Sequence, residues 1–370
     1  MQIMEVKLHQ LKIPLKTSFK TSYGEMDAKE FLLIELIDCD GIIAYGEVEA
    51  FARPDYTEET IETAYNIITT FLIPGLQNWQ FTHPQDFREK FKWIRGNQMA
   101  KAGIEMALWD LYAKKKEVSL QELIGGTKQK VAVGVSLGIQ ENETALLNTI
   151  RRYVQKGYQR VKLKIQPGKD IRFIAAAREA FPNLTLMADA NSAYKVSDIV
   201  LLKKLDQFNL AMIEQPFSEK DFIDHAELQK QIKTAICLDE NLRSLEDVRQ
   251  AHLLGSCKAI NLKLARVGGY SEALDIINYC HQNNLLVWCG GMLEAGIGRA
   301  HNLLLASREE FVFPGDISAS SRYFEEDIIC EPFELIGDSL QVPKGFGIGV
   351  TLNNQVIKRF LKNTKTMVLR

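Results

Sequence analysis

One repeating pattern limits the possible folds of this chain more than any other feature. Short apolar segments recur through residues 131–316, and amphipathic stretches of helical length separate most of them. The apolar segments are residues 131–139, 160–165, 184–190, 210–216, 234–240, 258–264, 285–291 and 310–316. Strands that alternate with helices form a parallel sheet, and eight such strands close most economically into a barrel. An open doubly wound sheet is the alternative, but the first strand-to-helix turn lacks the G-x-G-x-x-G of that fold.

The regions on either side of this repeat have a different pattern of apolar and polar residues. Residues 1–50 alternate apolar and polar side chains around a turn at Asp40-Gly41, which predicts antiparallel strands. Residues 57–125 predict helices, with a start at 57–60 and apolar positions 104, 108 and 111 on one helical face. Residues 321–370 contain the strand-like pieces LQVP and IGVTL. We therefore predict an α/β protein in three parts. An α+β N-terminal capping domain spans 1–126, a (β/α)7β TIM-like barrel spans 127–320, and a C-terminal segment, 321–370, returns to complete the cap.

Composition excludes several classes of partner. Lys and Arg number 45 against 47 Asp and Glu, so the chain lacks the basic excess that nucleic-acid and anionic-membrane binders need. No run of 18 apolar residues predicts a membrane span, and the first residues do not read as a secretion leader. The six cysteines contain no C-x-x-C pair, which favours reduced thiols over disulfides or zinc. We expect a cytoplasmic homo-oligomer whose function depends on a local site.

Charged residues end several of the predicted strands at nearly constant spacing. Lys164, Asp189, Glu214 and Asp239 are each separated by 25 residues, and Lys263 follows after 24. One strand–helix unit therefore lies between each residue and the next. In a barrel this spacing places the side chains around the carboxyl-terminal rim, where barrel enzymes keep their active sites.

Each of these residues also has an ordinary structural explanation. Lys162 and Lys164 alone would be read as a solvated strand face, and Asp189 as a turn residue. Asp239 could begin a helix, and Glu214 could simply end a strand. These explanations would require five charged residues to meet on one rim by accident, so we favour a functional cluster.

The residue types on this rim indicate a particular chemistry. Three carboxylates from adjacent strands form a hard-oxygen site suited to Mg²⁺, with Mn²⁺ as a substitute, whereas no His or Cys is placed for zinc. Lysines beside such a metal suit removal of a proton from a carbon next to a carboxylate, because the metal stabilises the resulting enediolate. A lysine is normally protonated at pH 7, and both the metal and the Lys162 ammonium disfavour the charged form of a neighbouring lysine.

The strand-end series also resembles a known family over nearly the whole chain. The K-x-K, D-A-N, E-Q-P, D-E and N-L-K elements resemble the muconate-lactonizing subgroup of the enolase superfamily. Within that subgroup the chain is similar to the o-succinylbenzoate synthase / N-acylamino acid racemase branch. The segments that carry this similarity are GVSLG (134–138), INLKLARVGG (260–269), CGGMLEAGIGRAHN (289–302), FPGDISASSRYFEEDI (313–328), PLKTSFKTSYG (14–24) and KAGIEMALWDLYAK (101–114).

The resemblance implies a role for each candidate residue. It makes Asp189, Glu214 and Asp239 the Mg²⁺ ligands. It places Lys164 and Lys263 on opposite sides of the substrate α-carbon, with Lys162 assisting Lys164. Asn191 and Glu240 would support the metal ligands from behind, and residues 18–22 would form a mobile lid. The residues expected to contact substrate are Phe19, Tyr56, Ser136, Gly291, Met292 and Ile317. Glu294, a polar residue in a glycine-rich loop, is expected to orient Lys263 or that loop.

The resemblance also implies an activity on a small carboxylate substrate. It predicts an Mg²⁺-dependent o-succinylbenzoate synthase of menaquinone biosynthesis. Such an enzyme dehydrates 2-succinyl-6-hydroxy-2,4-cyclohexadiene-1-carboxylate to 2-succinylbenzoate by syn elimination, through an enediolate.

Other activities stay open at this point. A racemase of N-acyl or N-succinyl amino acids would use the two lysines as a pair of bases, and one protein could do both reactions. A dipeptide epimerase is disfavoured because Gly315-Asp316-Ile317-Ser318 offers one carboxylate where that enzyme has Asp-x-Asp. The mandelate racemase subgroup needs a histidine near the seventh strand, which residues 285–291 lack. A barrel that binds metal and ligand without catalysis is the remaining alternative.

Overall fold

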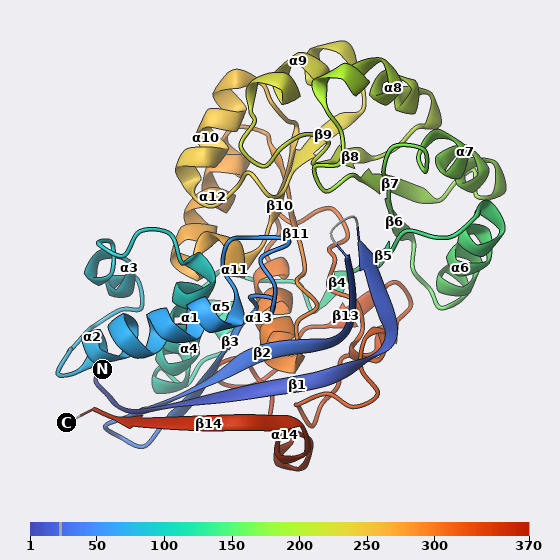
Figure 1. Ribbon diagram of the computed structural model, residues 1–370. Coiled ribbons are helices and arrows are strands. Elements are labelled where there is room, and N and C mark those ends of the chain that lie inside the picture. Colours follow the sequence, from blue (N-terminus) through green and yellow to red (C-terminus); the bar gives the residue numbers. More distant parts are fainter. Residues whose placement is uncertain (22–23, 370) are drawn as a thin grey trace.

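The computed structural model describes residues 1–21 and 24–369 and places them in three sheets with surrounding helices (Figure 1). A parallel sheet of seven strands follows the order β11-β10-β9-β8-β7-β6-β5. Its strands are β5 (Val135–Leu137), β6 (Arg160–Lys164), β7 (Thr185–Asp189), β8 (Met212–Glu214), β9 (Ala235–Leu238), β10 (Ala259–Leu262) and β11 (Leu286–Cys289). The sheet curls into an arc with helices on its outer side, which confirms the predicted α/β barrel class.

The eighth apolar segment, residues 310–316, differs from the regular strand that its sequence predicts. It makes only a parallel bridge between Val133 and Gly315 within the described residues. Pro314 has no N–H to donate, so a continuous ladder is not available there. The segment still joins the two ends of the sheet. Gly315 accepts a hydrogen bond from Gly134 N–H at 2.8 Å, and Asp316 N–H donates to Cys289 O at 2.9 Å.

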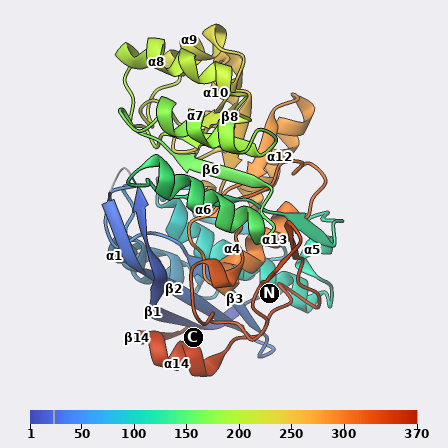
Figure 2. The same ribbon diagram turned by 90° about the vertical axis from the view of Figure 1, so that its right-hand side faces the viewer.

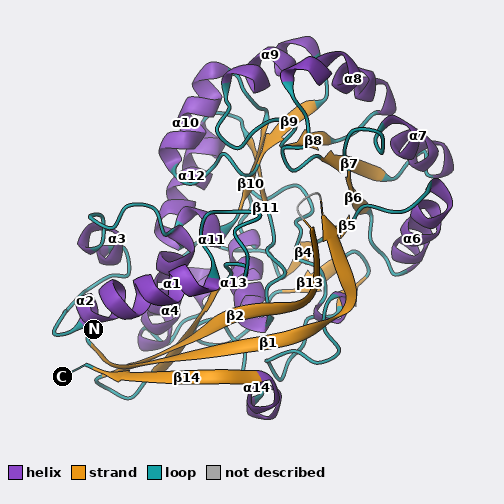
Figure 3. Cartoon of the chain, in the orientation of Figure 1, coloured by secondary structure: helices purple, strands orange, loops and turns teal. Residues whose placement is uncertain are grey.

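Helices surround the barrel sheet (Figure 3). Asn142 and Ser244 begin two of them, because each side chain accepts a hydrogen bond from a first-turn backbone N–H. The helices are α6 (Glu143–Gln155), α7 (Ile171–Ala180), α8 (Ile199–Lys203), α9 (Ile223–Gln231), α10 (Leu245–Leu254), α11 (Leu264–Val267), α12 (Tyr270–Gln282) and α13 (Gly296–Ala306). Of these, α11 and α13 are buried along their whole length. Short helical turns lie at Val196–Asp198, Lys204–Phe208 and Ser320–Arg322.

The N-terminal region, which we call the cap, is an antiparallel sheet packed on helices. Its strands are β1 (Ile3–Thr21), β2 (Gly24–Asp38) and β3 (Ile43–Val48). Its helical segments are α1 (Ile61–Ile67), η1 (Ile68–Leu72), α2 (Ile73–Leu76), α3 (Asp86–Lys90), α4 (Gln98–Lys115) and α5 (Leu120–Leu123). Helix α4 packs directly on β3, since a Cβ at Gly46 would lie 2.0 Å from Gly103 O. The expected Asp40-Gly41 turn joins β2 to β3, with Gly41 at φ +78°.

The C-terminal segment touches both the barrel and the cap. Strands β12 (Leu335–Ile336) and β13 (Ser339–Gln341) pair antiparallel and extend β4 (Lys130–Ala132). After α14 (Asn354–Phe360), strand β14 (Leu361–Val368) pairs antiparallel with β1 and completes the cap sheet. Figure 2 shows α14 and β14 on the side of the cap away from the barrel helices. Within residues 1–21 and 24–369, the IGVTL piece forms no strand, and its Leu352 makes an isolated bridge with Ile329. Among the described helices, none is both long and apolar enough to cross a membrane.

Candidate active site

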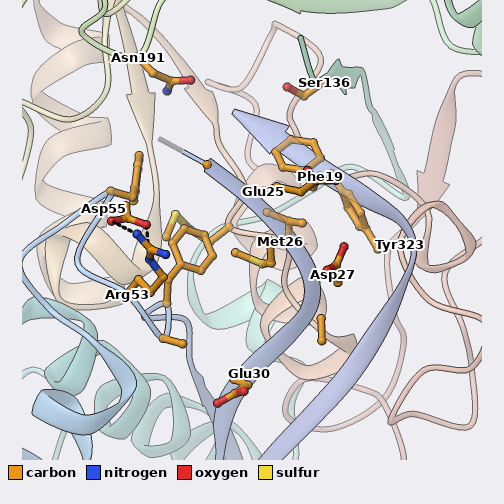
Figure 4. Close-up of a pocket in the computed structure, with 18 of the residues that line it drawn as sticks. Phe19, Glu25, Met26, Asp27, Glu30, Arg53, Asp55, Ser136, Asn191 and Tyr323 are labelled. Carbon is orange, nitrogen blue, oxygen red and sulfur yellow. Dashed lines mark hydrogen bonds and ion pairs between the residues drawn. The ribbon is translucent and has the colours of Figure 1, made fainter. Parts of the chain in front are cut away.

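A cavity of about 430 Å³ lies between the cap and the rim of the barrel. The cap contributes residues from the β1–β2 hairpin and from segment 51–56, and the barrel contributes strand ends and the loop after β11. Figure 4 shows side chains of the cap, such as Phe19 and Met26, facing barrel side chains such as Ser136 and Asn191. The cavity is therefore enclosed by two parts of the chain that are distant in sequence.

The predicted rim residues meet at the barrel side of this cavity. Lys164 Nζ lies 2.6 Å from Asp189 Oδ2, and Lys263 Nζ lies 2.7 Å from Asp239 Oδ2. Lys162 Nζ lies 2.9 Å from Glu214 Oε2 and 3.0 Å from Asp189 Oδ2. All three carboxylates are buried, with at most 1% of each residue exposed. The constant spacing in the sequence thus brings three acids and three lysines into one cluster.

Close packing of these charges changes how the groups titrate. Burial acts to raise the pKa of Asp189, but the Lys164 and Lys162 ammonium groups outweigh it and lower that pKa to about 2. Burial and the charge of Asp189 raise the pKa of Glu214 to about 8. Burial acts to lower the pKa of Lys162, but nearby carboxylates, first that of Asp316, raise it well above its ordinary value. Glu214 is therefore an acid whose charged form a further cation would stabilise.

The donor set fits a hard divalent cation. Asp189, Glu214 and Asp239 offer carboxylate oxygens, which Mg²⁺ prefers, from adjacent parallel strands or the residue directly after one. Asp239 Oδ1 is buried without a hydrogen-bond partner among the described residues, and lies 3.9 Å from Arg266 Nε. Buried polar atoms of this kind usually have a partner, so this oxygen fits the role of a metal ligand.

A second layer of polar residues holds the rim in place. Asn191 Nδ2 donates to Glu240 Oε1 at 2.9 Å, and Lys164 Nζ donates to Asn191 Oδ1 at 2.5 Å. Arg266 donates to the main-chain oxygen of Glu240. Asn191 has φ +42°, a conformation that Asn tolerates better than most residues. These contacts connect the ends of β6, β7 and β9 behind the carboxylates.

Tyr56 joins the cap to the barrel rim. Its hydroxyl donates to Asp239 Oδ2 at 3.0 Å and accepts from Lys263 Nζ at 2.7 Å. The ring also packs edge-on against Phe51, with centroids 5.9 Å apart. Tyr56 was expected to line the pocket, but its contact with Lys263 was not foreseen, because residue spacing says nothing about which cap side chain meets which strand end.

The remaining predicted residues divide into two groups. Phe19, Ser136, Gly291 and Met292 line the cavity, as the resemblance implies. Ile317, also expected to contact substrate, is completely buried in the barrel core and is not among the residues that line this cavity. The chain bends at Asp316, which lines the cavity, and the next side chain, Ile317, packs in the barrel core instead.

Glu294 and Ser18, the first residue of the expected lid at 18–22, each form hydrogen bonds with residues nearby in the sequence. Glu294 accepts hydrogen bonds from Met292 N–H at 2.5 Å and Asn302 Nδ2 at 2.9 Å. These two contacts tie Glu294 to its own loop and to α13, and among the described residues no hydrogen bond joins it to Lys263. In the expected lid, Ser18 Oγ donates to Glu25 and Phe19 lines the cavity, whereas Ser22 lies outside the described residues.

Three contributors to the site were missed in the sequence. Asp316 lines the cavity and forms ion pairs with Lys162 Nζ at 2.6 Å and Arg160 Nη1 at 2.7 Å. Trp288 lies inside the barrel with its ring 5.3 Å from Lys162 Nζ. A signal for Asp316 was present, because it ends the eighth apolar segment as the rim residues end theirs. Arg160 and Trp288 sit within apolar runs and give no such signal.

Family models match most of the chain. Residues 3–125 match the mandelate racemase / muconate lactonizing enzyme N-terminal domain, and residues 145–356 match the enolase C-terminal domain-like family. The chain is 57% identical to an o-succinylbenzoate synthase of Listeria innocua serovar 6a, over 100% of this chain and 99% of the relative. It is 43% identical to an N-succinylamino acid racemase of Thermus thermophilus, over 97% of each chain.

Solved structures agree with these matches. A crystal structure of an enolase superfamily member from Listeria innocua has a TM-score of 0.98 and 57% identity, covering 100% of both chains. Family models, relatives and structure point to the same group as the strand-end residues. The chain belongs to the enolase superfamily, in the mandelate racemase / muconate lactonizing enzyme group.

Proposed function

We propose that this chain is an o-succinylbenzoate synthase of menaquinone biosynthesis. It would dehydrate 2-succinyl-6-hydroxy-2,4-cyclohexadiene-1-carboxylate to 2-succinylbenzoate. The observation that carries the proposal is the pairing of lysines with strand-end carboxylates on one cavity wall. The relative named o-succinylbenzoate synthase at 57% identity supports the same reaction. The activity is that of a carbon–oxygen lyase.

Lys164 is proposed to carry out both proton transfers. Its neutral amine takes the proton from the carbon next to the substrate carboxylate, and the electron pair forms an enediolate. The enediolate then collapses, the carbon–oxygen bond to the leaving hydroxyl breaks, and Lys164 returns the proton to that oxygen to release water. One base serves both steps because the departing proton and hydroxyl lie on the same face of the ring. Hydrogen bonds to Asp189 and Asn191 fix the amine in position.

Lys263 is proposed to stay an ammonium ion and stabilise the negative charge of the intermediate. Burial acts to lower the pKa of Lys263, but the charge of Asp239 and the neighbouring Tyr56 raise it well above its ordinary value. A buried fixed cation stabilises a developing anion more than a solvated one does. The hydroxyl of Tyr56 holds this ammonium from the cap side.

Asp189, Glu214 and Asp239 would hold the divalent metal that enolase superfamily enzymes use. We propose Mg²⁺, with Mn²⁺ able to substitute, because all three ligands are carboxylates. When bound, this ion would supply positive charge that stabilises the enediolate, the doubly charged form that the substrate carboxylate takes after proton removal. Asn191 and Glu240 would keep the ligands oriented, as their mutual hydrogen bond favours.

The cavity walls would contact the rest of the substrate. Phe19 and Met292 offer apolar contacts to the ring or the succinyl chain, and Ser136 offers a hydroxyl. Ser136 Oγ is buried without a hydrogen-bond partner among the described residues, so it is available to a substrate oxygen. The backbone of Gly291 completes that wall.

A second activity, racemisation of N-succinylamino acids, is favoured by one specific observation. Lys164 and Lys263 both line the cavity, so a substrate α-carbon between them would meet a base on each face. A relative 43% identical is named N-succinylamino acid racemase. Dipeptide epimerisation gains less support, because Asp316 is engaged by Arg160 and Lys162 rather than open to a substrate ammonium.

We further propose the setting in which the enzyme acts. The residues divide into a capping domain at 1–126, a barrel at 127–320 and a returning segment at 321–370. The enzyme would act on a small carboxylate in the cytoplasm as a homo-oligomer. The near-zero net charge supports the absence of nucleic-acid and anionic-membrane partners.

The test is an assay of the purified protein against both substrate classes, with Mg²⁺ and with a chelator. We expect 2-succinylbenzoate to form from the cyclohexadiene carboxylate, only when a divalent metal is present. A panel of N-succinyl and N-acetyl amino acids, assayed for loss of optical activity and for solvent deuterium uptake, measures the second activity. Unchanged cyclohexadiene substrate after incubation with Mg²⁺ would refute the proposed synthase.

A further inference from the structure

Asp316 lies on the barrel rim beside Lys162 but does not belong to the proposed metal ligands. Its Oδ2 lies 2.6 Å from Lys162 Nζ, and its Oδ1 lies 2.7 Å from Arg160 Nη1. The three side chains are 9%, 4% and 0% exposed, respectively. Two cations therefore share one carboxylate in a buried setting, where each contact is stronger than it would be in water.

Arg160 holds Asp316 in a fixed position. Its Nη2 and Nε donate to Pro314 O at 2.8 and 3.2 Å. The guanidinium therefore binds both the carboxylate of Asp316 and the backbone two residues before it. Gly134 leaves room for this arrangement, since a Cβ there would lie 2.1 Å from the guanidinium. Arg160 and Lys162 are two residues apart on β6 and share one face of the strand.

Lys162 has three carboxylate partners of two kinds. Asp316 is the nearest at 2.6 Å, and Glu214 and Asp189 follow at 2.9 and 3.0 Å. Of these three partners of Lys162, only Glu214 and Asp189 are proposed metal ligands. A divalent cation bound to those two oxygens would take them from Lys162 and also repel its ammonium group. A buried ammonium that loses its partners is costly unless another acceptor remains.

We propose that Asp316, fixed by Arg160, is a positioning residue that retains Lys162 when metal occupies Asp189 and Glu214. Metal binding then exchanges partners within the cluster and leaves no buried cation unpaired. Without this carboxylate, Lys162 would depend on the two metal ligands and compete with the metal for them. This inference rests on the proposed function, because that proposal assigns Asp189 and Glu214 to the metal.

The test measures Mg²⁺ affinity by titration calorimetry in the absence of substrate, for wild type and Asp316→Asn. We expect the variant to bind Mg²⁺ at least about tenfold more weakly, as for the loss of one hydrogen bond to a charged group. Asp110→Asn is the matched control, since it replaces another buried aspartate that pairs with a lysine, Lys114 at 2.8 Å, away from the cavity. The control should bind Mg²⁺ as wild type does.

A second background separates competition by Lys162 from a simple loss of negative charge. In Lys162→Met, no ammonium competes for Asp189 and Glu214, so adding Asp316→Asn should change Mg²⁺ affinity by less than about twofold. An equal loss of affinity in both backgrounds would mean that Asp316 acts through its charge alone, and would overturn the proposal. Unchanged affinity of Asp316→Asn in the wild-type background would overturn it too.

Folding and function are controlled separately. If Asp316→Asn does not fold by circular dichroism, Asp316→Glu replaces it, because the longer side chain keeps the charge but displaces the carboxylate from Lys162. Asp316→Glu should then weaken Mg²⁺ binding in the wild-type background and leave it nearly unchanged in Lys162→Met. Wild type that binds Mg²⁺ but dehydrates no substrate would contradict the proposed function and leave this inference intact. A wild type that binds no divalent metal would overturn both.

Discussion

Lys29 offers a sharp test of how the cap is held against the barrel. This lysine on β2 is completely buried, and its Nζ donates to Met292 O at 2.8 Å and to Glu49 O at 3.3 Å. Met292 belongs to the loop that lines the cavity, so the ammonium connects the cap to the cavity wall. The Phe51 ring, another cavity residue, lies 4.6 Å from the same Nζ. Lys29→Met keeps the length of the side chain and removes the charge.

The magnitude follows from the charges around Lys29. Glu47, Glu49 and Glu294 surround it, and all three are buried. Burial and the charges of Glu294 and Glu47 raise the pKa of Glu49 well above its ordinary value, so the site favours the neutral form of this carboxyl group. Removing a cation from a buried charge cluster costs about 3–5 kcal/mol. We expect Lys29→Met to lose that much free energy of unfolding, a large share of the about 5–15 kcal/mol typical of a folded domain.

Urea unfolding followed by circular dichroism measures this loss. Glu49→Gln is the matched control, because it replaces a carboxyl group of the same cluster whose neutral form burial favours, and should cost less than about 1 kcal/mol. The loop carrying Gly291 and Met292 should also shift in Lys29→Met, raising KM more than it lowers kcat. A loss below about 1 kcal/mol, or equal losses for the two variants, would refute the reasoning.

Two further predictions concern the interior. Burial lowers the pKa of His301 from 6.5 to about 4. On acidification the unfolded chain therefore takes up a proton at this residue before the folded protein does. The free energy of unfolding should fall by up to about 3 kcal/mol between pH 6.5 and 4. Urea titrations across that range should show a weaker pH dependence for His301→Gln, and identical slopes would contradict this. Gly290→Ala would place a Cβ 2.0 Å from Asn261 Oδ1 and 2.7 Å from Lys263 Cγ. Turnover should fall at least about tenfold as Lys263 is displaced, and wild-type kcat would contradict the packing shown.

The rim of the site was predictable because parallel strands impose a simple geometry. A constant strand–helix length brings strand ends to one edge, so the 25-residue spacing of Lys164, Asp189, Glu214 and Asp239 predicts their meeting. In the structure each of the three carboxylates lies within hydrogen-bonding distance of a lysine: Asp189 of Lys164, Glu214 of Lys162 and Asp239 of Lys263. No knowledge of side-chain packing was needed for that step.

Contacts between distant segments could not be predicted in the same way. Tyr56 reaches Lys263 across 207 residues, and Lys29 reaches Met292 across 263, through packing of the cap that no periodicity encodes. The eighth apolar segment has the composition of a strand, but Pro314 leaves it with a single bridge. The resemblance places Ile317 in the pocket, whereas the chain bends at Asp316 and Ile317 packs in the core.

Turnover by Lys164→Ala tests the central claim most directly. The cyclohexadiene carboxylate is incubated with Mg²⁺ and either wild type or the variant, and the aromatic product is followed by its absorbance while circular dichroism checks the fold. Because Lys164 is proposed to move the proton in both steps, we predict a loss of at least about a hundredfold in kcat with native circular dichroism. A folded Lys164→Ala that keeps more than about a tenth of wild-type turnover would contradict the account.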